Sequence, residues 1–218
     1  MIKKKWIIIT AVTTISLISG VLVGPVMSNV EIPNYEVLLT DQNIEIRRYQ
    51  PMIIAEVEIK GDRKDAINRG FRLLANYIFG NNTVQKSIAM TAPVQQQENK
   101  KIAMTAPVQQ QSNGDSWKVS FVMPSEYNMD NLPKPNNARV SINEISAKKF
   151  AVIKFSGFNT NNNVATHEKQ LMSYAESNQL KITGSPKYAF YNPPWTLPFM
   201  RRNEVMVNIN ENQEINFE

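Results

Sequence analysis

The clearest candidate for acid–base chemistry in this sequence is a carboxylate near a phenol in the C-terminal region. Glu204 falls in an expected strand, and Tyr188 and Tyr191 fall at the end of the strand before it. Two adjacent strands can hold a carboxylate against a phenol, and such a pair can exchange protons with a bound ligand. Arg201 and Arg202 favour a second interpretation, in which Glu204 forms an ion pair and the tyrosines pack in the core.

Other catalytic and metal-binding patterns are missing from the sequence. There is no cysteine, which excludes disulfides, thiolate metal sites and cysteine nucleophiles. His167 is the single histidine, and the chain has no Ser-His-Asp order, no metal-spaced histidine cluster and no glycine-rich phosphate loop. We therefore expect a binding protein and not an enzyme, with a hydrolase-like enzyme that uses Glu204 and a tyrosine as the alternative.

The net charge of +5 overstates how basic the folded part is. Three of the 24 basic residues are Lys3, Lys4 and Lys5, and the first 28 residues contain no acid, which leaves 21 basic against 19 acidic residues in the rest. A nucleic-acid-binding domain usually carries a clear basic excess, so we expect no nucleic-acid partner.

The N-terminus has the pattern of a targeting segment. After the three lysines, no charged residue occurs from Trp6 to Val30, a run long enough to cross a bilayer. Residues 1–30 are predicted to be a signal anchor or a signal peptide, with cleavage after Ser28 in the second case; the anchor is slightly favoured. The lysines would stay in the cytoplasm, so residues 31–218 would be membrane-anchored outside it, or secreted if cleaved.

The elements that must position these residues form two blocks of strands with one helix each. Asp62 is the expected N-cap of a helix that ends near Phe79, and its core face is expected at Ile67, Phe71, Leu74 and Ile78. The second helix is expected at about 164–178. Strands are expected at 35–39, 44–49, 53–59, 117–123, 139–145, 150–155, 186–191 and 203–209. This order predicts an antiparallel α+β domain.

A tandem repeat interrupts the first block. The segment KSIAMTAPVQQQ at 86–97 recurs as KKIAMTAPVQQQ at 100–111, with eleven of twelve positions identical at an offset of 14. Its glutamine-rich tails, followed by Asn113 and Gly114, predict an exposed excursion. This loop also supports a third class of function, an envelope protein that binds a protein partner; a neutral duplication is the alternative.

Three segments together carry a family resemblance. They are IEIRRYQP at 44–51, the repeated IAMTAPV, and YNPPWTLPFMRRNEV at 191–205. In this combination and order the chain resembles the SOUL haem-binding protein family over about residues 34–209. The resemblance implies a distorted antiparallel β-barrel of two pseudo-symmetric strand and helix units flanked by two helices. It also implies reversible, non-catalytic and non-covalent binding of haem or a related tetrapyrrole.

The resemblance implies an apolar surface cleft beside the first helix. By position it is lined by Asn68, Phe71, Arg72 and Ala75. Asn68 and Asn76 stand where some relatives have basic residues, so Arg72 is the remaining partner for a haem propionate.

The iron ligand is the least defined part of the implied site. Arg48 stands where some relatives have a histidine proposed as an axial iron ligand, and a guanidinium cannot bind iron. Met90, Met104, Tyr49 and His167 are the other residues of suitable type, and none of them is supported by its context. We therefore expect binding by burial of apolar surface, with weak or no axial ligation.

Overall fold

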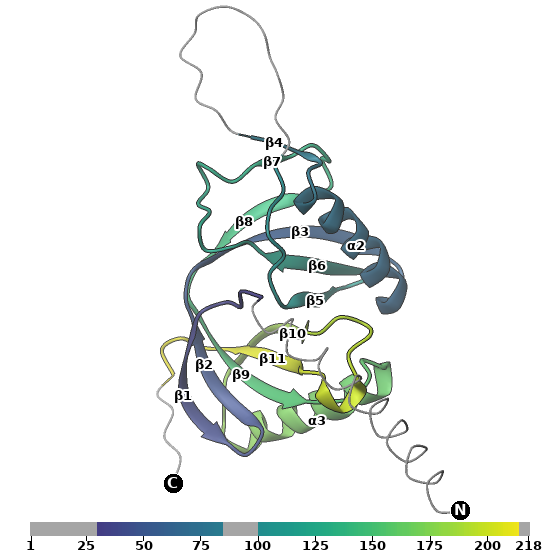
Figure 1. Cartoon of the computed structure of the whole chain (residues 1–218). Helices are drawn as coiled ribbons and strands as arrows, with labels where there is room; N and C mark the ends of the chain where they lie inside the picture. Colours follow the sequence, from purple (N-terminus) through teal and green to yellow (C-terminus); the bar gives the residue numbers. More distant parts are fainter. Residues whose placement is uncertain (1–29, 85–99, 214–218) are drawn as a thin grey trace, which may run out of the picture. The chain divides into compact units, whose positions relative to one another are not determined.

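A computed structural model describes residues 30–84 and 100–213, and the part from Glu31 onward forms one compact unit. Figure 1 shows its strands and helices. In chain order the elements are β1 (Tyr35–Asp41), β2 (Ile44–Tyr49), β3 (Met52–Lys60), α2 (Arg63–Ile78), β4 (Asn82–Thr83), β5 (Val108–Asn113), β6 (Ser116–Val122), β7 (Lys134–Pro135), β8 (Ser141–Ile145), β9 (Lys148–Phe155), α3 (Asn161–Ser177), β10 (Ile182–Phe190), η2 (Pro198–Met200) and β11 (Asn203–Ile209).

Nine of the described strands form one antiparallel sheet in the order β1-β2-β9-β11-β10-β5-β6-β3-β8. Its two halves have the same connectivity. In one half, β3 leads through α2 to β5, and the next strand, β6, lies between β3 and β5. In the other half, β9 leads through α3 to β10, and β11 lies between β9 and β10. The halves meet where β5 pairs with β10, from Val108 opposite Phe190 to Gln111 opposite Lys187.

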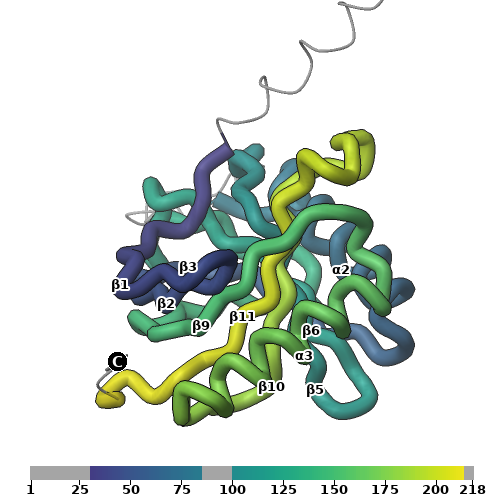
Figure 2. The backbone as a smooth tube through the Cα atoms, turned by 90° about the horizontal axis from the view of Figure 1, so that it is seen from below, coloured from purple at the N-terminus to yellow at the C-terminus, as the bar shows by residue number. Residues whose placement is uncertain are grey.

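The sheet is an open half-barrel, whereas the family resemblance implied a distorted antiparallel barrel. In the described chain β1 pairs with β2 and β8 pairs with β3, and neither edge strand pairs with the other. The tube in Figure 2, seen from below, shows the strands of the two halves following one another around this open arc. The α+β class is confirmed.

Helix α2 packs on β3 and β6 with a face that the apolar pattern only partly predicts. Asp62 caps the helix as expected, because its side chain accepts a hydrogen bond from the Asp65 backbone N–H. The buried residues are Ala66, Gly70, Leu74, Tyr77 and Ile78, so the core face is rotated away from Ile67 and Phe71. The reason is Gly70: a Cβ there would lie 2.7 Å from Val119 Cγ2, so the helix rests on β6 at a position without a side chain.

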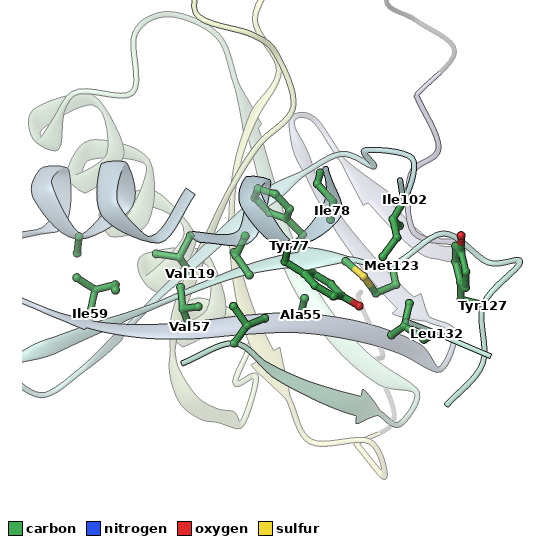
Figure 3. Close-up of a cluster of buried hydrophobic side chains, with 14 residues drawn as sticks. Ala55, Val57, Ile59, Tyr77, Ile78, Ile102, Val119, Met123, Tyr127 and Leu132 are labelled. Atoms are coloured by element: carbon green, nitrogen blue, oxygen red, sulfur yellow. The ribbon is translucent and has the colours of Figure 1, made fainter. Parts of the chain in front are cut away.

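Each helix covers its own hydrophobic core. The core under α2, part of which is drawn in Figure 3, joins Val57 and Ile59 of β3 to Val119 of β6 and Tyr77 of the helix. The core under α3 includes Ile46, Ile153, Leu171 and Val207. Trp117 packs against both cores, which places the two helices on the same face of the sheet.

The second copy of the repeat is part of the sheet and not an exposed excursion. Residues 108–113 form β5, and Gln110 is 1% exposed. Its amide is accommodated at the centre of the sheet by Arg63, whose Nη1 donates to Gln110 Oε1 at 3.4 Å. The expected hairpin turn exists, with Gly114 at φ +61°. The first copy, with Met90, lies outside the described residues.

The predicted targeting segment also lies outside the described residues. Within residues 30–84 and 100–213, no helix is long and apolar enough to cross a membrane.

Candidate ligand-binding site

The four residues that the resemblance assigns to the cleft share one face of α2. Asn68, Phe71, Arg72 and Ala75 are spaced by three and four residues, which places neighbours on one side of a helix. Asn68 and Arg72 are exposed, and Phe71 and Ala75 are half-buried. One turn further, Phe79 continues the same side and is 59% exposed. The structure therefore brings the four residues together, on a face that leads to an exposed aromatic ring.

This face is shallow. The Phe71 ring packs edge-on against Phe121 with centroids 5.4 Å apart, so part of Phe71 belongs to the core. Of the three cavities described below, none is lined by residues of α2. The α2 face thus presents the apolar side chains of Phe71, Ala75 and Phe79, with the exposed cation Arg72 beside them.

One cavity of about 410 Å³ lies between the segments 31–34, 50–53 and 122–129. That volume is in the range of roughly 300–1,000 Å³ usual for small-molecule sites. Its apolar lining includes Met52, Met123 and Met129. Its charged lining residues are Glu31 and Glu144, with no basic residue, so a ligand with carboxylates would meet like charge there.

A second cavity opens on the helix-free face of the sheet, the face opposite the two helices. Tyr49, Phe150, Lys148 and Lys187 are among the residues that line it. Burial, and secondarily the nearby Lys148, lowers the pKa of Lys187. The charge would suit an acidic ligand, but the volume is about 20 Å³, room for about one water molecule.

Position 48 lies far from α2 in the topology. Arg48 is on β2 in the half of the sheet that α3 covers, pairs with Glu36 at 3.4 Å, and lines a third cavity of about 330 Å³ with Leu38 and Leu39. Helix α2 packs on β3 and β6 in the other half. A side chain at position 48 therefore cannot bind the iron of a haem that lies on α2.

Of the other possible iron ligands, His167 and Tyr49 are held by contacts of their own. The His167 ring stacks on Phe155 with centroids 4.0 Å apart, and its Nδ1 lies 2.8 Å from the Asn163 carbonyl oxygen. Burial, with the nearby Glu204 carboxylate, raises the pKa of Tyr49 to about 12, so the phenol stays protonated. Met104 is exposed. In the described chain, no group of three His, Cys, Asp or Glu side chains could hold a metal ion.

Glu204 is the centre of a buried polar network on the helix-free face. Arg47 donates to both of its carboxylate oxygens at 3.0 Å, Tyr191 donates at 2.8 Å, and Arg202 donates at 2.9 Å. Burial opposes the charge of Arg47, yet the contacts with Glu204 outweigh burial and raise the pKa of Arg47. Arg47 also donates to Glu45 at 2.7 Å, which extends the network along β2.

This geometry decides between the two interpretations of Glu204. The carboxylate does contact Tyr191, as the sequence suggested, and it also pairs with Arg202. Tyr188 points to the helix side and donates to Glu168 at 2.8 Å. Because each oxygen of Glu204 already accepts two hydrogen bonds and the side chain is fully buried, no acceptor position is left for a substrate proton. The network is structural.

The sequence analysis did not predict that Arg47 and Glu45 belong to this network. The segment IEIRRY alternates apolar and polar residues, which is typical of a strand with one solvated face. The sequence does not show which strands are neighbours. Because β9 pairs with both β2 and β11, Glu204 lies near Arg47, although the two residues are 157 positions apart in the chain.

The fold is that of an α+β half-barrel with one open nine-stranded sheet. Residues 30–208 match the model of the SOUL heme-binding protein family. Since the match covers most of the sequence, the chain belongs to the SOUL family, whose description implies haem binding. No match was found among curated proteins.

Solved structures support the same fold. The C-terminal domain of EcmrR aligns with a TM-score of 0.56 at 11% identity, covering 81% of this chain and 98% of that one. An uncharacterized conserved protein from Listeria innocua aligns with a TM-score of 0.51 at 12% identity, covering 78% and 93%. At such identities the likeness shows the fold and does not transfer a function.

Proposed function

We propose that this protein binds haem or a related tetrapyrrole reversibly and without catalysis. The observation that carries the proposal is the match of residues 30–208 to the SOUL haem-binding family. The structure supports the non-catalytic part, because Glu204 is saturated with hydrogen bonds from Arg47, Tyr191 and Arg202.

We place the tetrapyrrole on the α2 face made by Asn68, Phe71, Arg72 and Ala75, extended by Phe79. A porphyrin is a flat apolar ring with two acidic groups, so its site needs apolar area and a cation. The 410 Å³ cavity has acidic charges, and the cavity beside Lys187 is too small. In the third cavity both cations already have partners, because Arg48 pairs with Glu36 and Lys149 donates to the Glu211 carbonyl. The α2 face combines half-buried Phe71 and Ala75 with the exposed cation Arg72.

Binding on this face would be driven by removing apolar surface from water, at about 25 cal/mol per Å². Arg72 would pair with one propionate, and because the pair stays exposed it would contribute only about 0.2–1 kcal/mol. None of the residue types that bind haem iron lies at the five positions of this face. Affinity should therefore depend little on the metal.

We also propose that the domain works outside the cytoplasm, anchored by residues 1–30 or released after cleavage near Ser28. The support is the lysine-flanked apolar run from Trp6 to Val30. Mass spectrometry of the N-terminus of the protein recovered from a membrane fraction tests this: an intact Met1 supports the anchor, and a start near Asn29 supports cleavage.

Titration of residues 31–218, which form a compact unit with its own cores, with hemin and with metal-free protoporphyrin tests the haem proposal. Saturable changes of the Soret band and of tryptophan fluorescence, with similar affinity for both ligands, are expected. Binding of hemin alone would show that an iron ligand dominates. Saturable binding of neither would overturn the proposal.

Matched variants locate the site. Phe79→Ser removes exposed apolar area from the α2 face and should weaken binding, and Arg72→Gln should weaken it about two- to five-fold, as expected for an exposed ion pair. The controls are Met129→Ser in the 410 Å³ cavity and the exposed Arg139→Gln, which should bind normally. Loss of binding in Met129→Ser with normal binding in Phe79→Ser would move the ligand into the cavity.

A further inference from the structure

The connection from β10 to β11 exposes a group of large apolar side chains. Together with Phe158 of the β9–α3 connection they form one surface, which we call the apolar loop surface. It is defined by Phe158 (56% exposed), Trp195 (72%), Leu197 (54%), Phe199 (74%) and Met200 (51%). None of these side chains lines the three cavities described above. The surface protrudes, so it is not a small-molecule pocket.

The loop is held in one conformation by its own hydrogen bonds. Thr196 N–H donates to the Pro193 carbonyl at 3.1 Å and Met200 N–H donates to the Leu197 carbonyl at 2.9 Å. Arg201 donates to the carbonyls of Thr196 and Pro194. These bonds, with three prolines that restrict the backbone, fix the apolar side chains outward, so their exposure is a built feature of the loop.

Phe158 belongs to the connection between β9 and α3, which lies beside the β10–β11 loop. Gly157 N–H donates to the Pro198 carbonyl at 2.8 Å, and the Arg201 guanidinium lies 4.9 Å from the centre of the Phe158 ring. The connections β9–α3 and β10–β11 therefore form one patch.

The charges beside the patch are positive. Residues 191–203 and 156–163 contain no acidic residue, whereas Arg201 and Arg202 lie in the loop. Arg63 lies next to it, because its guanidinium donates to the Asn159 carbonyl at 2.8 Å. Bulky apolar side chains with tryptophan among them, next to arginines, are the composition of surfaces that lie at the interface of a bilayer.

The loop also lies near the point where the domain begins. Arg202 Nη2 is 3.3 Å from the Tyr35 hydroxyl. Tyr35 is four residues from Glu31, where the compact unit starts, and four extended residues span at most about 14 Å. Figure 2 shows the first described residues, in purple, and the yellow loop along the same side of the domain, at the top of the view. The residues before Glu31 are the uncharged run predicted to enter the membrane.

We propose that the apolar loop surface inserts into the headgroup region of a lipid bilayer, beside the membrane that the N-terminal segment enters. Trp195, Leu197 and Phe199 bury their side chains at the acyl boundary, and Arg201 contacts lipid phosphates. The domain then has two attachment points, which fix its orientation on the membrane. This proposal does not depend on haem binding.

The absence of cysteine allows a site-specific test in the full-length chain. Met200→Cys in the loop and Ala138→Cys in the exposed β7–β8 connection, which Figure 1 shows near the other end of the sheet, are each labelled with an environment-sensitive dye. The proteins are reconstituted into vesicles of phosphatidylcholine and phosphatidylglycerol that contain nitroxide-labelled lipid. Phe199→Cys serves as a second loop position.

The dye in the loop should shift its emission to the blue and lose intensity to the nitroxide, whereas the dye at position 138 should do neither. Adding Trp195→Ser and Leu197→Ser to the labelled loop variants should abolish the shift, with the thermal midpoint unchanged because both side chains are exposed. Loop dyes that stay in water, or that are quenched equally with and without the two serines, overturn the proposal. A loop in water would leave a protein as the partner of this surface.

Discussion

Arg47 and Glu204, 157 residues apart in the chain, form a two-pronged ion pair in which both side chains are completely buried. The pair joins β2 to β11 across β9, on the face of the sheet that the helices leave uncovered. Tyr35 adds to it, because the Arg47 guanidinium lies 4.4 Å from the centre of the Tyr35 ring. The α3 half of the sheet is therefore held on one face by this ion pair and a small hydrophobic cluster that includes Phe150 and Met206, and on the other face by the core under α3.

Breaking this pair from one side should be costly. Glu204→Gln leaves the buried charge of Arg47 with Glu45 as its remaining acidic partner, and the free energy of unfolding should fall by about 3–5 kcal/mol. Urea denaturation followed by circular dichroism measures it. Glu36→Gln, which removes the exposed partner of Arg48, is the control and should change stability by about 1 kcal/mol or less. An equally small effect of Glu204→Gln would mean that the pair does not stabilise the sheet.

Stability should fall in alkali because buried tyrosines must lose protons. Burial raises the pKa of Tyr49 to about 12 and raises the pKa of Tyr191 well above its ordinary value, whereas an unfolded tyrosine ionises near pH 10. Above pH 10 the folded form thus holds more protons than the unfolded form. The stabilisation that these tyrosines provide is therefore complete below pH 10 and is lost as pH rises to 12 and beyond. The expected slope is about 1.4 kcal/mol per pH unit for each such tyrosine.

Unfolding curves at several pH values above 9, with tyrosinate absorbance followed in parallel, check this slope. Tyr49→Phe should make the slope of stability against pH between pH 10 and 12 shallower by about 1.4 kcal/mol per pH unit, the contribution of one tyrosine. A slope that is the same in Tyr49→Phe and in the parent protein would count against the assignment.

His167 should prove dispensable for haem binding and useful for stability. His167→Ala removes a ring stacked on Phe155, so the thermal midpoint should fall by the equivalent of about 1 kcal/mol. The Soret band of bound hemin should keep its position and amplitude. If the band moves to that of free hemin, His167 is an iron ligand and α3 carries the site.

Gly70 should tolerate no side chain. Alanine is intrinsically better in a helix by about 1 kcal/mol, but its Cβ would lie 2.8 Å from Val119 Cβ, an atom close to the β6 backbone. Gly70→Ala should therefore destabilise the protein by about 1–3 kcal/mol, and α2 should shift away from β6. A change to Ala at exposed Lys64 on the same helix is the control. A more stable Gly70→Ala protein would show that α2 can shift at no cost.

The sequence was a good guide where apolar side chains set the element. Strands β2 and β11 have the expected bounds, and Asp62 caps α2 as expected. Helix α3 begins at Asn161, three residues before its first apolar residue, because Thr160 accepts a hydrogen bond from the Asn163 backbone and supplies the cap. Three asparagines in a row suggested a loop, since their propensity is low in helices.

The parts that could not be predicted depend on partners distant in sequence. Gln110 has the composition of an exposed tail, and only its contact with Arg63 and its place between β10 and β6 make it internal. Likewise, the apolar pattern of α2 placed Phe71 in the centre of the core, because a glycine such as Gly70 adds nothing to such a pattern. For the ligand site, the family resemblance supplied Asn68, Phe71, Arg72 and Ala75; they share one face of α2, and their role remains a prediction.

One contact at the base of the repeat has a consequence for the history of the gene. Asn82 hydrogen-bonds both the backbone N–H and the carbonyl of Lys100, at 3.0 and 2.7 Å, so the described residues on the two sides of 85–99 lie next to each other. Residues 86–99 are one complete unit of the duplication, and removing them would join Gln85 to Lys100 with β5 intact. The 14-residue unit could thus have been gained, and can be lost again, in one in-frame event without altering the sheet. Length variation at this site between strains would then be expected without loss of the fold.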